Sequence, residues 1–168
     1  HWFAGYSWAR AALLELERAR PAAALPYCAS LREHAALLGD CAEVPCGRVA
    51  EVTARLALGQ RDDAALARAL AELRTADAPV LLAQILVCVA EAERAAGMIA
   101  EAIGHADEAI GVAIRAERPT EIVLARSLLA RIAEGNGRTG EVTRQRDALT
   151  AMSSDSLGAR ALAVLAEL

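Results

Sequence analysis

The fold is decided by residues 86–109, which read LVCVAEAERAAGMIAEAIGHADEA. The pattern predicts an apolar helix that ends at Gly97, followed at once by a second helix with small residues at Ala102, Ala106 and Ala109. The small residue that opens this second helix recurs at nearly even spacing, at Ala24, Ala64, Ala102 and Val142. A fixed period of this size, about 39 residues, is typical of helical repeats, because each repeat buries its apolar face against the next one.

The composition favours the same architecture. Alanine occupies 42 of the 168 positions, and hydrophobic residues make up 55% of the chain, yet only five residues are aromatic. Alanine is the best helix former and lets helices approach closely, whereas runs rich in Val, Ile, Thr and Tyr, which strands prefer, are missing. We therefore expect an all-α fold of tightly packed helices.

Nine helices can be placed from the periodicity and the turn signals, among them a continuous second helix from Pro21 to about Leu38. Asp62 or Asp63 is well placed as an N-cap after the Gly59 turn. Short connections make successive helices antiparallel hairpins. We expect a single domain over 1–168, with hairpin units at about 4–39, 42–76, 79–117 and 120–152 and a capping helix within 153–168.

Residues 86–109 resemble a tetratricopeptide repeat, with Leu86, Ala90, Gly97 and Ala102 at that family's large, small and turn positions. The first unit resembles it too, through Trp8 and the small or apolar residues that follow; the second unit is the weakest match. The resemblance covers nearly the whole chain and implies a right-handed α-solenoid of about four TPR-like repeats. The period of this chain is longer than the family's usual repeat of roughly 34 residues.

The long units with Ala- and Arg-rich helices also resemble the degenerate repeats in the helical arms of large bacterial ATP-binding regulators. This resemblance implies a non-catalytic protein–protein interaction module, a scaffold segment of a larger signalling or transcription-regulating protein. Two other functions stay open: a ligand-sensing and oligomerisation arm of such a regulator, and, ranked lower, an all-helical enzyme. The chain begins with His1-Trp2 rather than Met, so we expect it to be part of a longer polypeptide.

In the tetratricopeptide family the first helix of each pair lines a concave groove. Carrying those positions over implies a groove that is apolar near the N-terminus and charged toward the C-terminus, able to take a protein or peptide partner. Its apolar end either binds a ligand or packs against a missing upstream repeat, and in the second case self-association is expected. The candidate binding residues are Tyr6, Leu13, Val49, Gln84, Glu91, Arg94, Ser127 and Arg131.

No catalytic, cofactor or metal site is predicted. Cys41 and Cys46 lack the spacing of a zinc-ligand pair, and His34 and His105 stand far apart in the sequence. The cluster Glu91, Glu93 and Arg94 is interpreted as a solvated helix face with local ion pairs.

The charge pattern bears on partners. The net charge is −4 and all 18 basic residues are arginines mixed with acids, without the basic stripe of a nucleic-acid-binding protein. No uncharged apolar stretch approaches the length that a membrane-spanning helix needs. We therefore expect a cytoplasmic protein with free thiols that contacts neither nucleic acid nor membrane.

Overall fold

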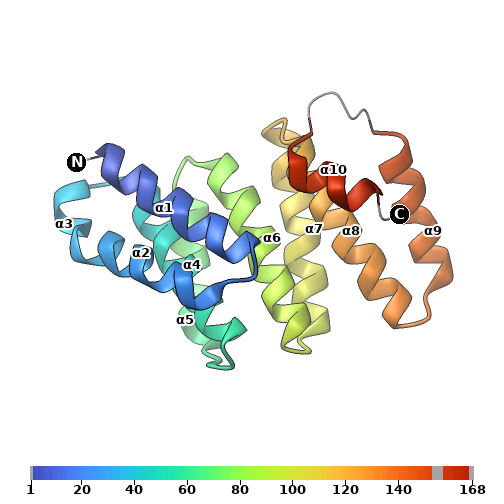
Figure 1. The fold of residues 1–168 in the computed structure, drawn as a ribbon, viewed down its shortest axis with the longest axis horizontal. Coiled ribbons are helices and arrows are strands. Elements are labelled where there is room, and N and C mark those ends of the chain that lie inside the picture. Colours follow the sequence, from blue (N-terminus) through green and yellow to red (C-terminus); the bar gives the residue numbers. More distant parts are fainter. Residues whose placement is uncertain (1, 153–156, 167–168) are drawn as a thin grey trace.

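The computed structural model describes residues 2–152 and 157–166, which form ten helices and no strand (Figure 1). The expected all-helical fold is confirmed for this part of the chain. The helices are α1 (Trp2–Glu17), α2 (Pro21–Glu33), α3 (Ala35–Leu38), α4 (Glu43–Ala57), α5 (Asp63–Thr75), α6 (Pro79–Ala95), α7 (Ile99–Arg115), α8 (Pro119–Gly135), α9 (Thr139–Thr150) and α10 (Ala159–Ala166).

The predicted continuous helix from Pro21 to Leu38 is wrong, because the chain breaks at His34 between α2 and α3. His34 adopts φ −101° and ψ 5°, and its Nδ1 lies 2.9 Å from the Ser30 carbonyl oxygen. The imidazole ring also packs against the Trp8 indole, with ring centroids 4.9 Å apart. Contacts of the His34 side chain thus accompany a break that the helical periodicity does not reveal.

The turn inside each predicted hairpin has a common geometry. Ala19, Gly59, Gly97 and Gly137 adopt positive φ values of 55°, 83°, 79° and 69°, and they are spaced along the chain as the sequence indicated. After each of them, the next backbone N–H donates to the carbonyl five residues earlier at 2.8 Å. This hydrogen bond is typical of helix C-termini at which one residue adopts the left-handed conformation. Glycine adopts that conformation without steric cost.

Burial of the second helices follows the predicted register in two of the four units. Cys28 and Leu31 are buried with Ala24, and Ala106 and Ala109 are buried with Ala102. In the second unit Ala64 is exposed, and the buried residues are instead Leu66, Ala69, Leu70 and Leu73. In the fourth unit Val142 is half-buried, while Gln145 and Leu149 are buried.

The slip in the second unit has a local cause. Arg61 and Asp62 lengthen the turn, and the Asp62 carboxylate accepts the Ala65 N–H at 2.9 Å. This capping bond, predicted from the sequence, starts α5 at Asp63, later than the period requires.

Helix α6 lies at the centre of the packing. It contacts α1, α4, α7 and α8, and all ten residues from Leu81 to Ala90 are buried. The first helices of neighbouring hairpins also contact each other, in the pairs α1–α4, α4–α6 and α6–α8. Figure 1 shows the helices following one another from α1 to α9, whereas α10 turns back over α8.

Candidate functional site

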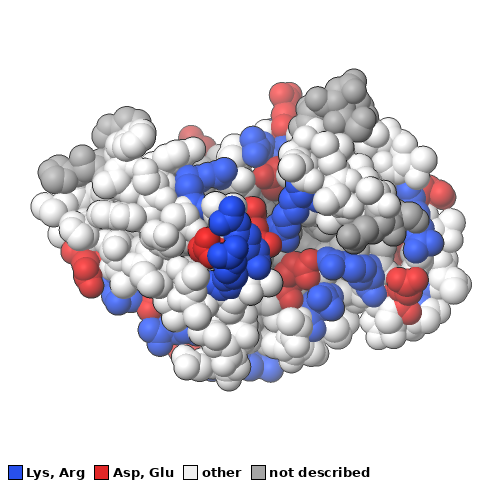
Figure 2. Space-filling view, viewed as in Figure 1, with Lys and Arg blue, Asp and Glu red and all other residues white. Residues whose placement is uncertain are grey.

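A groove lies along the faces of α1, α6 and α8, with α10 seated at its edge. Two hollows of about 430 Å³ and 290 Å³ occupy it, and both are lined by Glu17 of α1 and Arg160 of α10. Figure 2 shows this face hollowed between the end of α1 and α10, with arginine and acidic side chains gathered around the hollow. The groove therefore joins helices that lie at opposite ends of the sequence.

The groove lining is more basic than the chain as a whole. Five arginines and three glutamates line the two hollows, although the chain carries a net charge of −4. The arginines are Arg10, Arg94, Arg118, Arg131 and Arg160, and the glutamates are Glu17, Glu91 and Glu121.

Several of these polar side chains are paired, within one helix or between two. Glu91 of α6 accepts hydrogen bonds from Arg94, at 3.3 Å, and from Arg131 of α8. Arg118 forms an ion pair with Glu121 at 3.2 Å, and the Glu121 side chain is only 3% exposed. Arg10 of α1 donates a hydrogen bond to the amide oxygen of Gln84 on α6. These bonds fix the side chains that face the groove.

Two polar groups of the groove region lack a partner among the described residues. The Nη1 atom of Arg160 and the Oγ atom of Ser127 are both buried without a hydrogen bond. Ser127 lies on α8 within about one turn of Leu124 and of Arg131, each of which lines one hollow. A buried polar group without a partner is costly. Arg160 lines both hollows, so its Nη1 leaves the groove lining with an unsatisfied donor, whereas Ser127 is buried and lines neither hollow.

The structure brings together four of the eight candidate binding residues at the hollows. Glu91, Arg94 and Arg131 line the larger hollow and Gln84 lines the smaller one. Ser127, a fifth candidate, is buried on α8.

The remaining three candidates are placed elsewhere. The assignment of Leu13 and Val49 to the groove surface needs correction, because both are buried in the core at 2% and 0% exposure. Close packing of α1, α4 and α6 accounts for this, since it covers the apolar side chains between these helices. Tyr6 is 45% exposed but lines neither hollow.

Sequence reasoning missed Arg10, Glu17, Arg118, Glu121 and Arg160. Arg10 and Glu17 flank Leu13 on α1 about two turns apart, so an i, i+7 charge pattern could have revealed them. Arg160 could not be found in this way, because its place in the groove depends on α10 turning back over α8.

A carboxyl–imidazole contact lies between α6 and α7. The Glu93 side chain is 1% exposed, and its Oε2 lies 2.8 Å from Nδ1 of His105, which is 20% exposed. The interpretation of Glu93 as part of a solvated face is therefore wrong. The helical spacing of Glu91, Glu93 and Arg94 places Glu93 on a different side of α6, where α7 covers it.

Three of the four free cysteines are buried: Cys28, Cys46 and Cys88. Burial raises the pKa of each of these thiols to about 12, and for Cys88 the nearby Glu17 adds to the increase. A thiol with so high a pKa is a poor nucleophile at neutral pH. The described residues hold no group of three His, Cys, Asp or Glu side chains placed to bind a metal ion.

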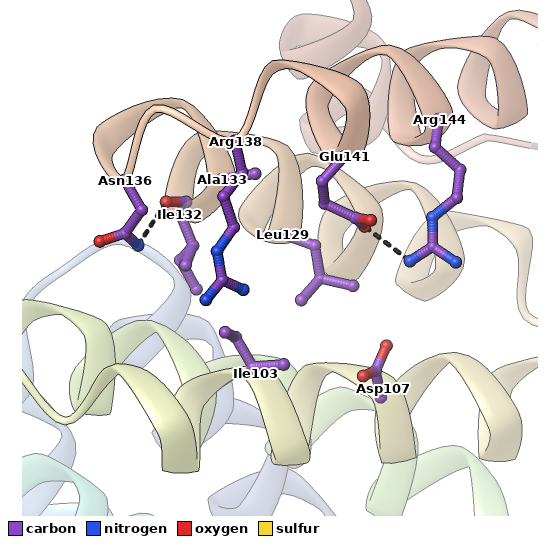
Figure 3. A pocket seen from close by; sticks show the side chains of 9 residues that line it. All are labelled: Ile103, Asp107, Leu129, Ile132, Ala133, Asn136, Arg138, Glu141 and Arg144. Carbon is purple, nitrogen blue, oxygen red and sulfur yellow. Dashed lines mark hydrogen bonds and ion pairs between the residues drawn. The ribbon is translucent and has the colours of Figure 1, made fainter.

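A separate hollow of about 210 Å³ lies between α7, α8 and α9 (Figure 3). Its floor includes Ile103, Leu129 and Ile132, and Figure 3 shows the Arg138 side chain reaching over them. On its rim Arg144 donates to Glu141 at 2.7 Å, and this bond lowers the pKa of the Glu141 carboxyl. This hollow has about half the volume of the larger hollow of the groove.

Comparison with family models, curated proteins and solved structures finds no match for this chain. None of the helices in the described ranges is long and apolar enough to cross a membrane. The class that the fold defines is an all-helical protein built from helical hairpins, and its function must be inferred from the groove itself.

Proposed function

We propose that this chain is a TPR-like α-solenoid that binds a protein or peptide partner in the groove between α1, α6 and α8. The module acts by recognition, without covalent chemistry, as a regulatory or scaffold segment of a larger cytoplasmic protein. The free cysteines agree with a reducing compartment.

The repeat architecture is supported by the turns and the packing. Four hairpin turns with left-handed residues recur at nearly even spacing, and the first helices of successive hairpins contact each other as well as their own partners. Stacked repeats are expected to show such nearest-neighbour contacts.

The observation that carries the binding proposal is the convergence of Glu91, Arg94 and Arg131 on one hollow. These side chains come from two different first helices, and their ion pairs hold them toward the groove. Fixed polar groups beside apolar surface, such as that of Leu16, Cys88 and Ala92, are the features by which a groove recognises a peptide.

The test uses peptides selected from a random displayed library by the unmodified chain. In a variant carrying Glu91→Ala, Arg94→Ala and Arg131→Ala, the Kd of those peptides is expected to rise at least about tenfold, because arginine contacts at an interface centre carry much of the binding energy. Fluorescence anisotropy with labelled peptides measures the change.

A second ion-pair triad offers a matched control. Glu51 pairs with Arg32 and Arg55 between α2 and α4, away from the two hollows. Replacing all three by Ala removes the same charges and is expected to leave the Kd unchanged. Equal affinity of both variants for the selected peptides would refute the groove as the binding site.

A role as an oligomerisation arm is favoured by one further observation. Tyr6, Tyr27 and Leu37 of α1, α2 and α3 are 45%, 37% and 64% exposed, and their burial in an interface between two copies would be favourable. We expect the molar mass from light scattering to rise toward that of a dimer with concentration, and Leu37→Asp to suppress the rise. A constant monomer mass at all concentrations would remove this alternative.

A further inference from the structure

Helix α10 lies at the groove's edge and makes three apolar contacts. Ala161 is buried against Val123 and Leu149, while the partly buried Leu165 packs on that cluster and Val164 packs on the main core. Just before the helix, the Gly158 N–H donates to Thr120 Oγ1 at 2.8 Å. Leu162, the next residue along α10, is 43% exposed. An eight-residue helix with one fully buried side chain is expected to open at lower cost than the core helices, even though Val164 and Leu165 also pack.

Arg160 carries the charge of α10 into the groove. It lines both hollows together with Glu17, and it lies close enough to Cys88 to influence the pKa of that thiol. Within the described ranges neither Glu17 nor Arg160 belongs to an ion pair, and Arg160 Nη1 is buried without a hydrogen bond. The Arg160 guanidinium therefore lies in the groove lining together with the unpaired Glu17 carboxylate, but the two groups do not form an ion pair.

We propose that α10 is a displaceable occupant of this groove, and that the partner is a short helix of the same chemistry: small apolar residues with one arginine. The small residues Gly158 and Ala159 line the smaller hollow beside Arg160, so this end of the groove accepts small side chains, and Glu17 attracts a cation. A separate helix is free to place its arginine against Glu17, which α10 does not do. This inference rests on the proposed function of the groove, because it names the partner that the groove takes.

The experiment measures alkylation of Cys88 by iodoacetamide in the full chain carrying Cys41→Ser. Cys88 lines the larger hollow with Arg160 and is 6% exposed. Cys28 and Cys46 belong to the same core cluster but line neither hollow and are 1% exposed, so their protection reports intact folding. Ala161→Glu places a charge against Val123 and Leu149 and is expected to displace α10. The Cys88 alkylation rate, resolved by peptide mass spectrometry, is then expected to rise about tenfold or more, because opening limits the reaction of buried thiols.

Leu162→Glu is the matched control, since it adds the same charge on the exposed side of α10. It is expected to leave the Cys88 rate unchanged. If Ala161→Glu also leaves the rate unchanged while Cys28 and Cys46 stay protected, α10 does not cover the groove and the inference is overturned.

The partner's chemistry is tested with a synthetic peptide of residues 157–166 added to the Ala161→Glu chain. The peptide is expected to protect Cys88 again, whereas the same peptide carrying Arg160→Glu is expected to give no protection. Equal protection by both peptides, or by neither, overturns the inference. The proposed function would survive that result, because it fails only if library peptides bind equally to the groove triad variant and its control.

Discussion

Ala102→Asp is expected to lower the free energy of unfolding by about 3–5 kcal/mol, because it buries an unpaired carboxylate. Ala102 is 0% exposed and belongs to the main core cluster, in which α7 packs against α6. The side chain added there has no solvent-exposed path, since Ala106 and Ala109 on the same face of α7 are also fully buried. Chemical denaturation followed by circular dichroism measures the loss.

Ala100→Asp is the matched control for this substitution. Ala100 is exposed in the first turn of α7, where a negative charge interacts favourably with the helix N-terminus. Its stability is expected to change by less than about 0.5 kcal/mol. If Ala102→Asp does not fold, the smaller loss of about 1–3 kcal/mol expected for Ala102→Val gives the same test. Unchanged stability in both Ala102 variants would contradict the packing of α6 against α7.

His105→Ala is expected to destabilise the chain by about 2–4 kcal/mol, because it leaves the buried Glu93 carboxylate without its partner. The 2.8 Å contact between His105 Nδ1 and Glu93 Oε2 links α6 to α7, and among the described residues His105 is the side chain that pairs with Glu93. Thermal unfolding monitored by calorimetry or circular dichroism detects the effect.

Two further variants distinguish the loss of the Glu93–His105 contact from the loss of any side chain of similar size. Replacing both Glu93 and His105 by Leu is expected to recover most of the lost stability, since the pair is then exchanged for apolar contacts. Arg74→Ala removes the partly exposed pair with Glu108, at 2.6 Å, and is expected to cost less than about 1 kcal/mol. A loss for His105→Ala no larger than that for Arg74→Ala would contradict the importance of the buried pair.

Local signals in the sequence predicted the helices and turns of the described residues well. Gly59, Gly97 and Gly137 end helices with positive φ, and Asp62 caps α5, because backbone geometry and capping depend on residues close in sequence. The break at His34 and the exposure of Ala64 were not predicted. The first accompanies a contact with Trp8 across the α1–α2 hairpin, and the second follows from a lengthened turn.

The groove was predicted less completely, for a physical reason. Gln84, Glu91, Arg94 and Arg131 line the two hollows, and they were named because the tetratricopeptide groove positions were carried over to this chain. Leu13 and Val49 were named in the same way but are covered by neighbouring helices, and Glu93 is covered by α7. Arg160 reaches the groove only because α10 turns back. Which side chains neighbouring helices cover, and where the chain turns back, depend on tertiary packing. The periodicity along one helix does not encode either of them.

The central claim is that a partner lies in the groove between α1, α6 and α8. Photo-crosslinking tests it most directly, with a library-selected peptide that carries a benzophenone at its centre and with mass spectrometry to map the attachment sites. We predict crosslinks to residues 10–17 of α1, 84–94 of α6 and 118–131 of α8. Crosslinks confined to α5, α7 and α9, which do not line the two hollows, would contradict the claim.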